Sequence, residues 1–162
     1  MQIRFADPSE LNIITALINQ AFLVERFFKP GDRLDEETTG DFFRKGRFLV
    51  AEIDGSIAAC VYVEMRGDRA YLGLLSVAPD RQKLGLGRRM VSAAEEFARE
   101  MGAHFMDLRI VHLRTELPPI YEKYGYALNG TEEIPAEMAA EVSRPCYFLR
   151  MTKPLGAAAN QS

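Results

Sequence analysis

The sequence predicts a mixed α/β fold, in which helices flank a central mixed sheet. Helical and strand patterns alternate along the chain in the order β-α-α-β-β-β-α-β-α-β-β. Three strand patterns follow one another directly, over residues 47–53, 57–65 and 70–77. The first two are joined by Asp54-Gly55, a strong signal for a two-residue hairpin. Consecutive strands with tight turns indicate antiparallel pairing in this part of the sheet.

The N-terminal elements are a strand and two helices. We expect the strand over residues 2–5. Asp7 can cap the helix that follows, and Glu10 lies in its first turn. Apolar residues then recur with helical spacing as far as Phe22. A second, weaker helical pattern covers residues 36–44.

The second half of the chain repeats the alternation. A helix is expected from Leu86 to Met101, because apolar residues mark one of its faces, and Gly102 is placed to end it. The remaining elements are a strand, a short helix and two final strands, over residues 105–111, 118–124, 126–129 and 146–151.

Length and charge limit the function classes. The chain has 162 residues, the usual size of one domain, and we expect that domain over residues 1–154 with a disordered tail over 155–162. The formal net charge is −3 and the sequence pI is about 5.5. This balance argues against nucleic acid or an anionic membrane surface as the main partner.

The two cysteines, Cys60 and Cys146, belong to no CxxC pair. Together with the lack of a signal peptide or a membrane-spanning run, they favour a cytoplasmic protein. Cys60 lies in an apolar strand and is expected in the core rather than as a nucleophile. The spacing around His104 and His112 is not that of metal ligands, so no metal is expected.

The strongest functional signal is a glycine-rich turn between a predicted strand and a predicted helix, Gln-Lys-Leu-Gly-Leu-Gly-Arg over residues 82–88. A helix N-terminus offers free N–H groups and a positive dipole end, and Gly85 and Gly87 let an anion approach the main chain. Nearby basic side chains add to this, so the turn suits a ligand with two or more phosphates. A Rossmann fingerprint needs a third glycine where Met90 stands, and a P-loop needs Gly-Lys followed by Ser or Thr.

The pattern Gln82-x-x-Gly85-x-Gly87 instead resembles the donor-binding motif of the GNAT N-acetyltransferase superfamily. Residues 77–79, Val-Ala-Pro, are similar to that family's strand exit, and residues 119–126 are similar to its later tyrosine-bearing helix. The element order agrees from the first strand to about Lys153. The resemblance implies a GNAT-like, mostly antiparallel central sheet with flanking helices and one splayed strand pair, here 70–77 and 105–111.

The resemblance also implies acetyl-CoA as co-substrate. N–H groups of the glycine-rich turn would hold the coenzyme A pyrophosphate, and the preceding strand would pair with the pantetheine arm like an added strand. The residues assigned to this role are Leu75, Ser76, Val77, Gln82, Lys83, Leu84, Gly85, Leu86, Gly87 and Arg88.

The reaction implied is direct attack of an amine on the thioester, without a covalent enzyme intermediate. Tyr121 occupies the family's tyrosine position and is our candidate proton donor to the leaving sulfur; the competing interpretation is a tyrosine that only packs against the sheet. An amine near pKa 10 must also lose a proton before it attacks.

Two positions depart from the family pattern; the first concerns this proton, and the second, Arg114, would contact the coenzyme or the substrate or would be solvated. The strand segment 71–74 lacks the glutamate that often serves as general base, and Arg114 stands where an asparagine is common. The segment 22–33 would cover the acceptor site, or its aromatics would close the core. The candidate bases are bulk solvent or one of four side chains acting through water, namely Glu64, Asp107, His112 and Glu132.

Two other functions stay open at this point. Without the strand glutamate, the chain could be a non-catalytic coenzyme A binding or sensing module, or another kind of nucleotide-binding protein. The sequence does not identify the acceptor. A polyamine, an amino acid, an antibiotic and a protein N-terminus all fit. Homodimers are common in the family that the sequence resembles.

Overall fold

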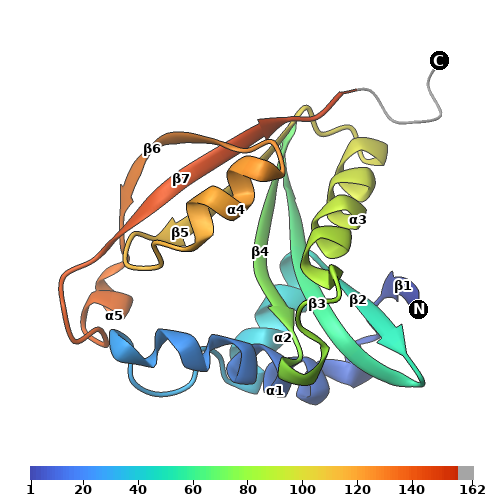
Figure 1. The fold of residues 1–162 in the computed structure, drawn as a ribbon, viewed down its shortest axis with the longest axis horizontal. Helices are drawn as coiled ribbons and strands as arrows, with labels where there is room; N and C mark the ends of the chain where they lie inside the picture. Colours follow the sequence, from blue (N-terminus) through green and yellow to red (C-terminus); the bar gives the residue numbers. More distant parts are fainter. Residues whose placement is uncertain (157–162) are drawn as a thin grey trace.

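A computed structural model describes residues 1–156, and these contain a single seven-stranded sheet with the order β1-β2-β3-β4-β5-β7-β6 (Figure 1). All neighbouring strands are antiparallel except β4 and β5, which are parallel. This confirms the predicted mixed, mostly antiparallel sheet. The strands are β1 (Gln2–Phe5), β2 (Arg47–Ile53), β3 (Ser56–Arg66), β4 (Arg69–Val77), β5 (Phe105–Val111), β6 (Ala127–Glu133) and β7 (Tyr147–Pro154).

The helices are α1 (Leu11–Ala21), α2 (Glu36–Lys45), α3 (Leu86–Glu100), α4 (Leu117–Lys123) and α5 (Ala136–Ala139). Three 3-10 turns accompany them, η1 (Pro8–Glu10), η2 (Phe22–Phe27) and η3 (Pro79–Arg81). The sequence did not predict η2, η3 and α5, because such short elements show no periodicity. Within residues 1–156, no helix has the length and apolar character needed to cross a bilayer.

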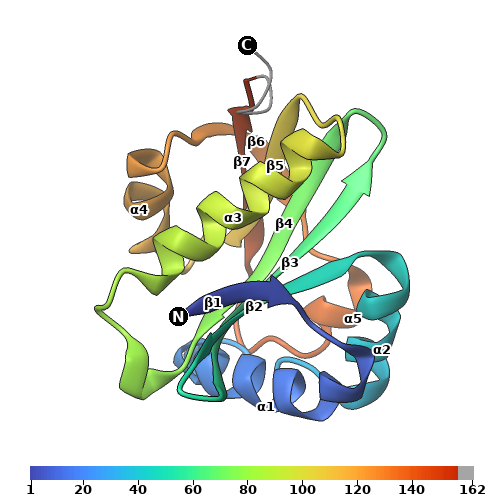
Figure 2. The same ribbon diagram turned by 90° about the vertical axis from the view of Figure 1, so that its right-hand side faces the viewer.

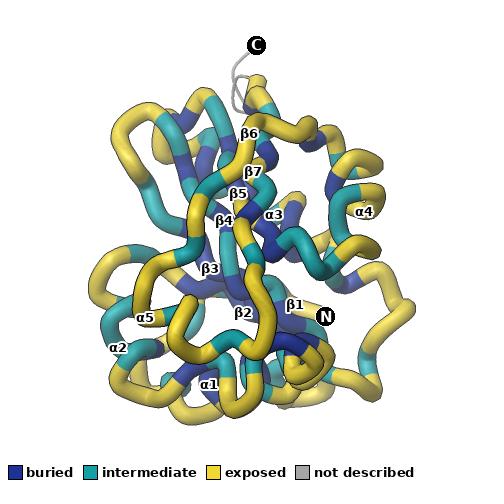
Figure 3. Tube along the Cα trace, turned by 90° about the vertical axis from the view of Figure 1, so that its left-hand side faces the viewer, coloured by how far each residue is buried: buried dark blue, intermediate teal, exposed yellow. Residues whose placement is uncertain are grey.

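Helices cover both faces of the sheet (Figure 2). On β2, Leu49 and Ala51 belong to one core cluster together with the apolar residues of α3. Phe48 and Val50 point to the opposite face and pack with α1. Because successive residues of a strand face opposite sides, a strand covered on both faces must be apolar there, as β2 is over residues 48–51 and β3 over residues 58–63. Figure 3 shows this buried centre, with β6 and α5 at the exposed periphery.

The β2–β3 connection is the predicted hairpin. Ile53 pairs with Ser56, which leaves Asp54 and Gly55 as a two-residue loop. Both have positive φ, 52° and 79°. This is the geometry of a type I′ turn, which matches the twist of the flanking strands. Gly102, with φ of 93°, likewise follows the end of α3 as predicted.

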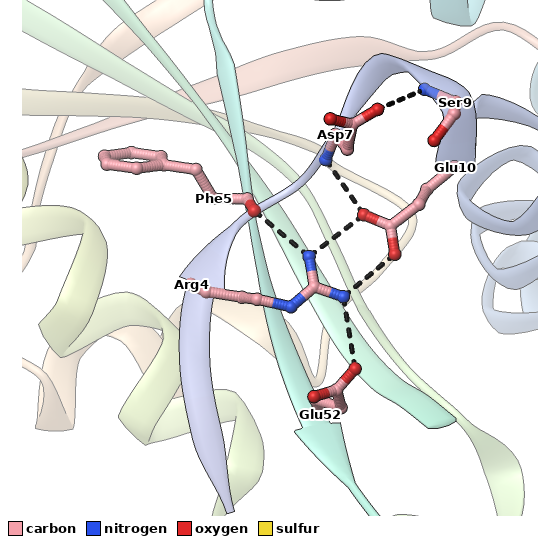
Figure 4. A network of polar contacts seen from close by, with 6 residues as sticks. All are labelled: Arg4, Phe5, Asp7, Ser9, Glu10 and Glu52. Carbon is pink, nitrogen blue, oxygen red and sulfur yellow. Dashed lines mark hydrogen bonds and ion pairs between the residues drawn. The ribbon is translucent and has the colours of Figure 1, made fainter. Parts of the chain in front are cut away.

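A polar network fixes the start of the first helical segment (Figure 4). The Asp7 side chain accepts from the Ser9 N–H at 2.9 Å, and the Glu10 carboxylate accepts from the Asp7 N–H at 2.8 Å. This is a capping box. Arg4 donates to both oxygens of Glu10 and also contacts Glu52 on β2, so the network ties β1, η1 and β2 together.

The chain end differs from expectation at Leu155. The sequence predicts a disordered tail from this residue onward, but Leu155 is buried in the core and its N–H donates to the His104 carbonyl at 2.9 Å. A single apolar residue after a proline gives no periodic signal. The rest of the expected tail, beyond residue 156, lies outside the described residues.

We expect Glu10→Gln to destabilise the fold by about 1 kcal/mol at neutral pH, because it weakens the charged contacts to Arg4. Hydrogen bonds from Arg4 and from the Asp7 N–H lower the pKa of Glu10 from 4.5 to about 2. The stabilisation is therefore complete above about pH 4.5 and is lost as the pH falls toward 2. Urea unfolding of both proteins at pH 7 and pH 3 measures this, with Glu122→Gln on exposed α4 as control. A difference that does not shrink at low pH contradicts the assignment.

Candidate functional site

The site is built around a split in the sheet. The parallel pairing of β4 with β5 runs only from Arg69↔Phe105 to Tyr71↔Asp107. Beyond these pairs the two strands separate, while β5 stays paired with β7 along its whole length. From Leu72 onward β4 therefore has no neighbouring strand on this side, and Figure 1 shows β4 and β5 diverging. The splayed pair that the resemblance implied is present.

An irregularity in β4 lies beside this open edge. The register between β3 and β4 shifts between Cys60 and Tyr62, and Leu74 on the facing strand has φ of 54°. A bulge of this kind bends a strand and redirects its side chains. Gly73 leaves room for the ring of Tyr71, since a Cβ at this position would lie 2.9 Å from that ring and displace it. The bulge therefore changes the direction of β4 at the point where β4 and β5 separate.

The residues assigned to the pantetheine arm lie on this edge. The Ala78 N–H donates to the Ala58 carbonyl on β3. Since N–H groups of adjacent strand residues point to opposite edges, the N–H of Val77 faces the open side. Ser76 has a buried side chain, whose hydroxyl donates to the Leu74 carbonyl at 3.0 Å. By the same alternation the N–H of Ser76, which pairs with Cys60, points to β3, so the main-chain donor at the open edge comes from Val77 and not from Ser76.

The glycine-rich turn leads from this edge into α3. Lys83 and Gly85 have positive φ, 70° and 75°, and Gly85 is the N-cap residue without a side-chain cap. The first backbone hydrogen bond onto the cap runs from the Arg89 N–H to the Gly85 carbonyl. The N–H groups before Arg89 therefore have no partner within the helix. Residues 82–85 are exposed, so these donors and the positive end of α3 face solvent.

Two further details of the turn fit an anion site. Leu86 is buried and anchors the start of α3 in the core. Gly87 has only one protein atom within reach of an added Cβ, Leu75 Cδ2 at 4.0 Å. Packing within the protein thus gives no reason for a glycine at this position, whereas close approach of a ligand does. Gln82, the first motif residue, donates from its side chain to the Val77 carbonyl at 3.5 Å and links turn to strand.

A cavity occupies the split between β4 and β5 and extends toward η2. Its apolar walls come from residues 72–75 on one side and from Leu108, Ile110 and Val111 on the other. Its outer end is charged and is lined by Glu25, Arg33, Arg109 and Arg114. An apolar groove that ends in a few charged groups is the usual form of a small-molecule site.

Tyr121 lines this cavity from α4. Its ring packs edge-on against Tyr124 and Tyr126, and the residue is buried. Among residues 1–156 its hydroxyl has no hydrogen-bond partner, whereas the Tyr126 hydroxyl donates to Glu95 at 2.7 Å. Burial raises the pKa of Tyr121 above its ordinary value, so this phenol stays protonated at neutral pH. It is an available hydrogen-bond donor that faces the cavity.

Glu25 is a site residue that we did not single out from the sequence. It lies on η2, is buried, and accepts a hydrogen bond from Arg114 at 2.7 Å. Burial raises the pKa of Glu25, and the neighbouring charge of Arg114 opposes this shift only in part. The segment 22–33 helps to close the core, as expected for its aromatics, since Phe28 is fully buried, and it also contributes Glu25 to the cavity lining.

The four candidate bases all lie outside this cavity lining. Glu64 accepts hydrogen bonds from Tyr62 and Arg66, and Asp107 is held by Arg69. His112 accepts from the Tyr147 N–H through Nδ1 at 3.1 Å and stacks on that ring. Glu132 pairs with Arg109 at 2.7 Å. The sequence identified residues with the chemistry of a base, but it could not show which of them lie in the cavity.

Comparisons with known proteins agree with this geometry. A sequence model described as the acetyltransferase (GNAT) family matches residues 12–126. A Xenopus tropicalis protein named probable N-acetyltransferase camello is 28% identical over 117 residues, which are 70% of this chain and 53% of that protein. Streptothricin acetyltransferase from Streptomyces lavendulae is 28% identical over 109 residues, 66% of this chain and 58% of that enzyme. The chain thus matches little more than half the length of these curated relatives.

The fold has solved counterparts. The yncA protein from Salmonella typhimurium, whose structure was determined with its cofactor acetyl-CoA, superimposes with a TM-score of 0.75 at 20% sequence identity. The superposition covers 100% of this chain and 98% of that chain. At this identity the similarity establishes the fold.

We expect Gly87→Ala to weaken coenzyme A binding by about tenfold, because the added methyl occupies space that the ligand needs. The same change should raise stability slightly, by about 0.5 kcal/mol, since alanine favours helix over glycine. Gly40→Ala in α2, where an added Cβ meets ordinary contacts, is the matched control and should raise stability alone. Titration calorimetry and thermal unfolding measure both effects. Unchanged affinity in Gly87→Ala would remove this residue from the site.

Proposed function

This chain belongs to the acetyltransferase (GNAT) family, and from that premise we propose that it transfers an acetyl group from acetyl-CoA to an amine. The observation that carries the proposal is the continuity between three features: the open edge of β4, the uncapped start of α3, and the cavity that holds Tyr121. The strand edge begins in the cavity lining at Leu72 to Leu75, and the chain then continues through the glycine-rich turn to the start of α3. A thioester with a diphosphate-bearing carrier fits this arrangement.

The main chain of the protein supplies the donor site. Free N–H groups from Lys83 to Arg88 would bind the pyrophosphate, and the edge from Leu75 to Val77 would pair with the pantetheine arm. Acetyl-CoA supplies an activated acyl group. Fixed N–H donors near Val77 on the open edge are suited to stabilise negative charge that develops on the thioester oxygen.

Tyr121 on α4 and Glu25 on η2 supply candidate proton chemistry in the same cavity. Tyr121 would donate a hydrogen bond to the leaving sulfur, a role that needs the protonated phenol that burial favours. Glu25 would accept the proton of the attacking amine. A carboxylate whose pKa is raised is a better base near neutral pH than an ordinary one. Neither role requires a glutamate on β4.

The compartment that suits this chemistry is the cytoplasm. Cys60 and Cys146 are both free thiols in the structure, and thiols stay reduced there. Cys60 is fully buried, and burial raises its pKa to about 12, so it is inert as a nucleophile. Direct transfer therefore remains the mechanism that we propose.

A thiol-release assay with acetyl-CoA and a broad amine panel tests the proposal. Acetylated product in stoichiometric amount with free coenzyme A supports it. Tight binding of coenzyme A without turnover across the panel favours the sensing module instead. A folded sample with no affinity for coenzyme A or its thioesters refutes both functions.

We expect Tyr121→Phe to lower kcat by about tenfold to a hundredfold, because the sulfur loses its hydrogen-bond donor. Stability should stay within about 0.5 kcal/mol of wild type, since no protein group within residues 1–156 depends on this hydroxyl. Tyr126→Phe provides the comparison: it removes one partner of buried Glu95 and should cost stability, with a smaller loss of turnover than Tyr121→Phe. Full kcat in Tyr121→Phe leaves only the packing role.

We expect Glu25→Gln to reduce kcat/KM by about tenfold or more near neutral pH, because the amine loses its proton acceptor. The deficit should shrink as the pH rises toward the pKa of the amine, where solvent removes the proton instead. In the wild type, kcat/KM should fall as the pH drops through the raised pKa of Glu25. Glu116→Gln is the control, because Glu116 also binds Arg114 but does not line the cavity. A deficit that is constant with pH contradicts the role of base.

A further inference from the structure

The charged end of the cavity carries more positive than negative charge. One carboxylate, Glu25, and three guanidinium groups line it, from Arg33, Arg109 and Arg114. Arg114 is paired with Glu25 and Arg109 with Glu132, each at 2.7 Å. These pairs leave one positive charge at the cavity without a counterion.

That charge belongs to Arg33. Within residues 1–156 its guanidinium makes no ion pair or side-chain hydrogen bond, and its aromatic neighbour is the ring of Phe22, 5.7 Å from Cζ. Burial lowers the pKa of Arg33, yet a guanidinium remains charged at physiological pH. Removing a charge from water without a partner is costly. Glu25 and Glu141 favour this charge from a distance, but within the described residues neither contacts the guanidinium. A ligand anion in direct contact would offset the cost more fully.

We propose that the acceptor is a small amine that also carries a carboxylate, an amino acid in the simplest case, and that Arg33 binds this carboxylate. The inference rests on the proposed acetyl transfer and names the substrate class for the same site. A guanidinium matches a carboxylate through two parallel hydrogen bonds, which fixes the orientation of the ligand as well as its charge. Arg33 is a specificity residue in this role.

The arrangement also explains how the amine becomes reactive. In an α-amino acid the amine and the carboxylate sit on the same carbon, so anchoring at Arg33 keeps the amine at the charged end, where Glu25 is the carboxylate of the lining. Neighbouring guanidinium charges disfavour an ammonium ion and lower its pKa. The same positive charge that selects the carboxylate therefore raises the fraction of neutral, nucleophilic amine.

Matched pairs of acceptors test the substrate class. The kcat/KM for thiol release is compared between L-amino acids and their carboxamides, which keep the size and side chain but lose the negative charge. Carboxamide amines are the less basic of the two, so their neutral fraction alone would favour the carboxamide. We expect at least one amino acid to be preferred over its carboxamide by about tenfold or more, the value of one charge-assisted contact.

Variants of Arg33 test whether the preference for amino acids over their carboxamides depends on this residue. Arg33→Met should raise KM for the amino acid and narrow the acid-to-carboxamide ratio by about tenfold, and Arg33→Lys should restore part of it. Arg26→Met is the control, since Arg26 lies on the preceding η2 segment but pairs with Asp32 at 3.1 Å outside the cavity. The thermal shift caused by acetyl-CoA should persist in all three proteins and reports that the donor site is intact.

The outcomes separate the two proposals. Equal or faster acetylation of carboxamides, or of amidated peptides with an N-terminal amine, overturns the substrate class and leaves acetyl transfer in place. The substrate class is overturned as well if no amino acid reacts although acetyl-CoA binds. Failure of the folded wild type to bind acetyl-CoA overturns the proposed function itself.

Discussion

The separation of β4 from β5 is the constraint on which the rest of the site depends. A strand edge in a protein interior must find partners for its polar main-chain groups, and from Leu72 onward β4 has no neighbouring strand on this side. The closed end of the split is fixed by Arg69, which holds both oxygens of Asp107 at 2.6 and 2.7 Å and also reaches Thr152 on β7 at 3.1 Å. The opening therefore starts at a defined residue pair.

The two sides of the split are held together by α3. Its apolar face packs on the β2–β4 side, and its buried Glu95 reaches to the other side. The Glu95 carboxylate accepts from the Tyr126 hydroxyl at 2.7 Å and from Lys153 Nζ on β7 at 2.9 Å. A buried, fully paired carboxylate is sensitive to displacement of any partner. This network keeps the start of α3, where the donor would bind, in a fixed relation to the helix of Tyr121.

The sequence predicted those parts of the fold and site that depend on local pattern. Residues 47–53 and 105–111 form strands with the expected bounds, and the Asp54-Gly55 turn follows from the conformations that each residue tolerates. The split was accessible only through the resemblance, because periodicity does not say which strands are neighbours. Glu25 was missed for a related reason: its partner Arg114 lies 89 positions away along the chain, and η2 is too short to orient its residues by pattern.

The environment of a carboxylate, rather than its presence, decides which one can serve as a base here. Hydrogen bonding from Arg69 lowers the pKa of Asp107, so this carboxylate holds protons weakly. Burial acts to raise the pKa of Glu64, but hydrogen bonds from Tyr62 and Arg66 outweigh it and leave the pKa below its ordinary value. For Glu25 the balance is reversed, since burial exceeds the effect of Arg114 and the pKa is raised. We therefore propose that a base is available without a strand glutamate, because Glu25 lines the cavity from η2 in an environment that favours proton uptake.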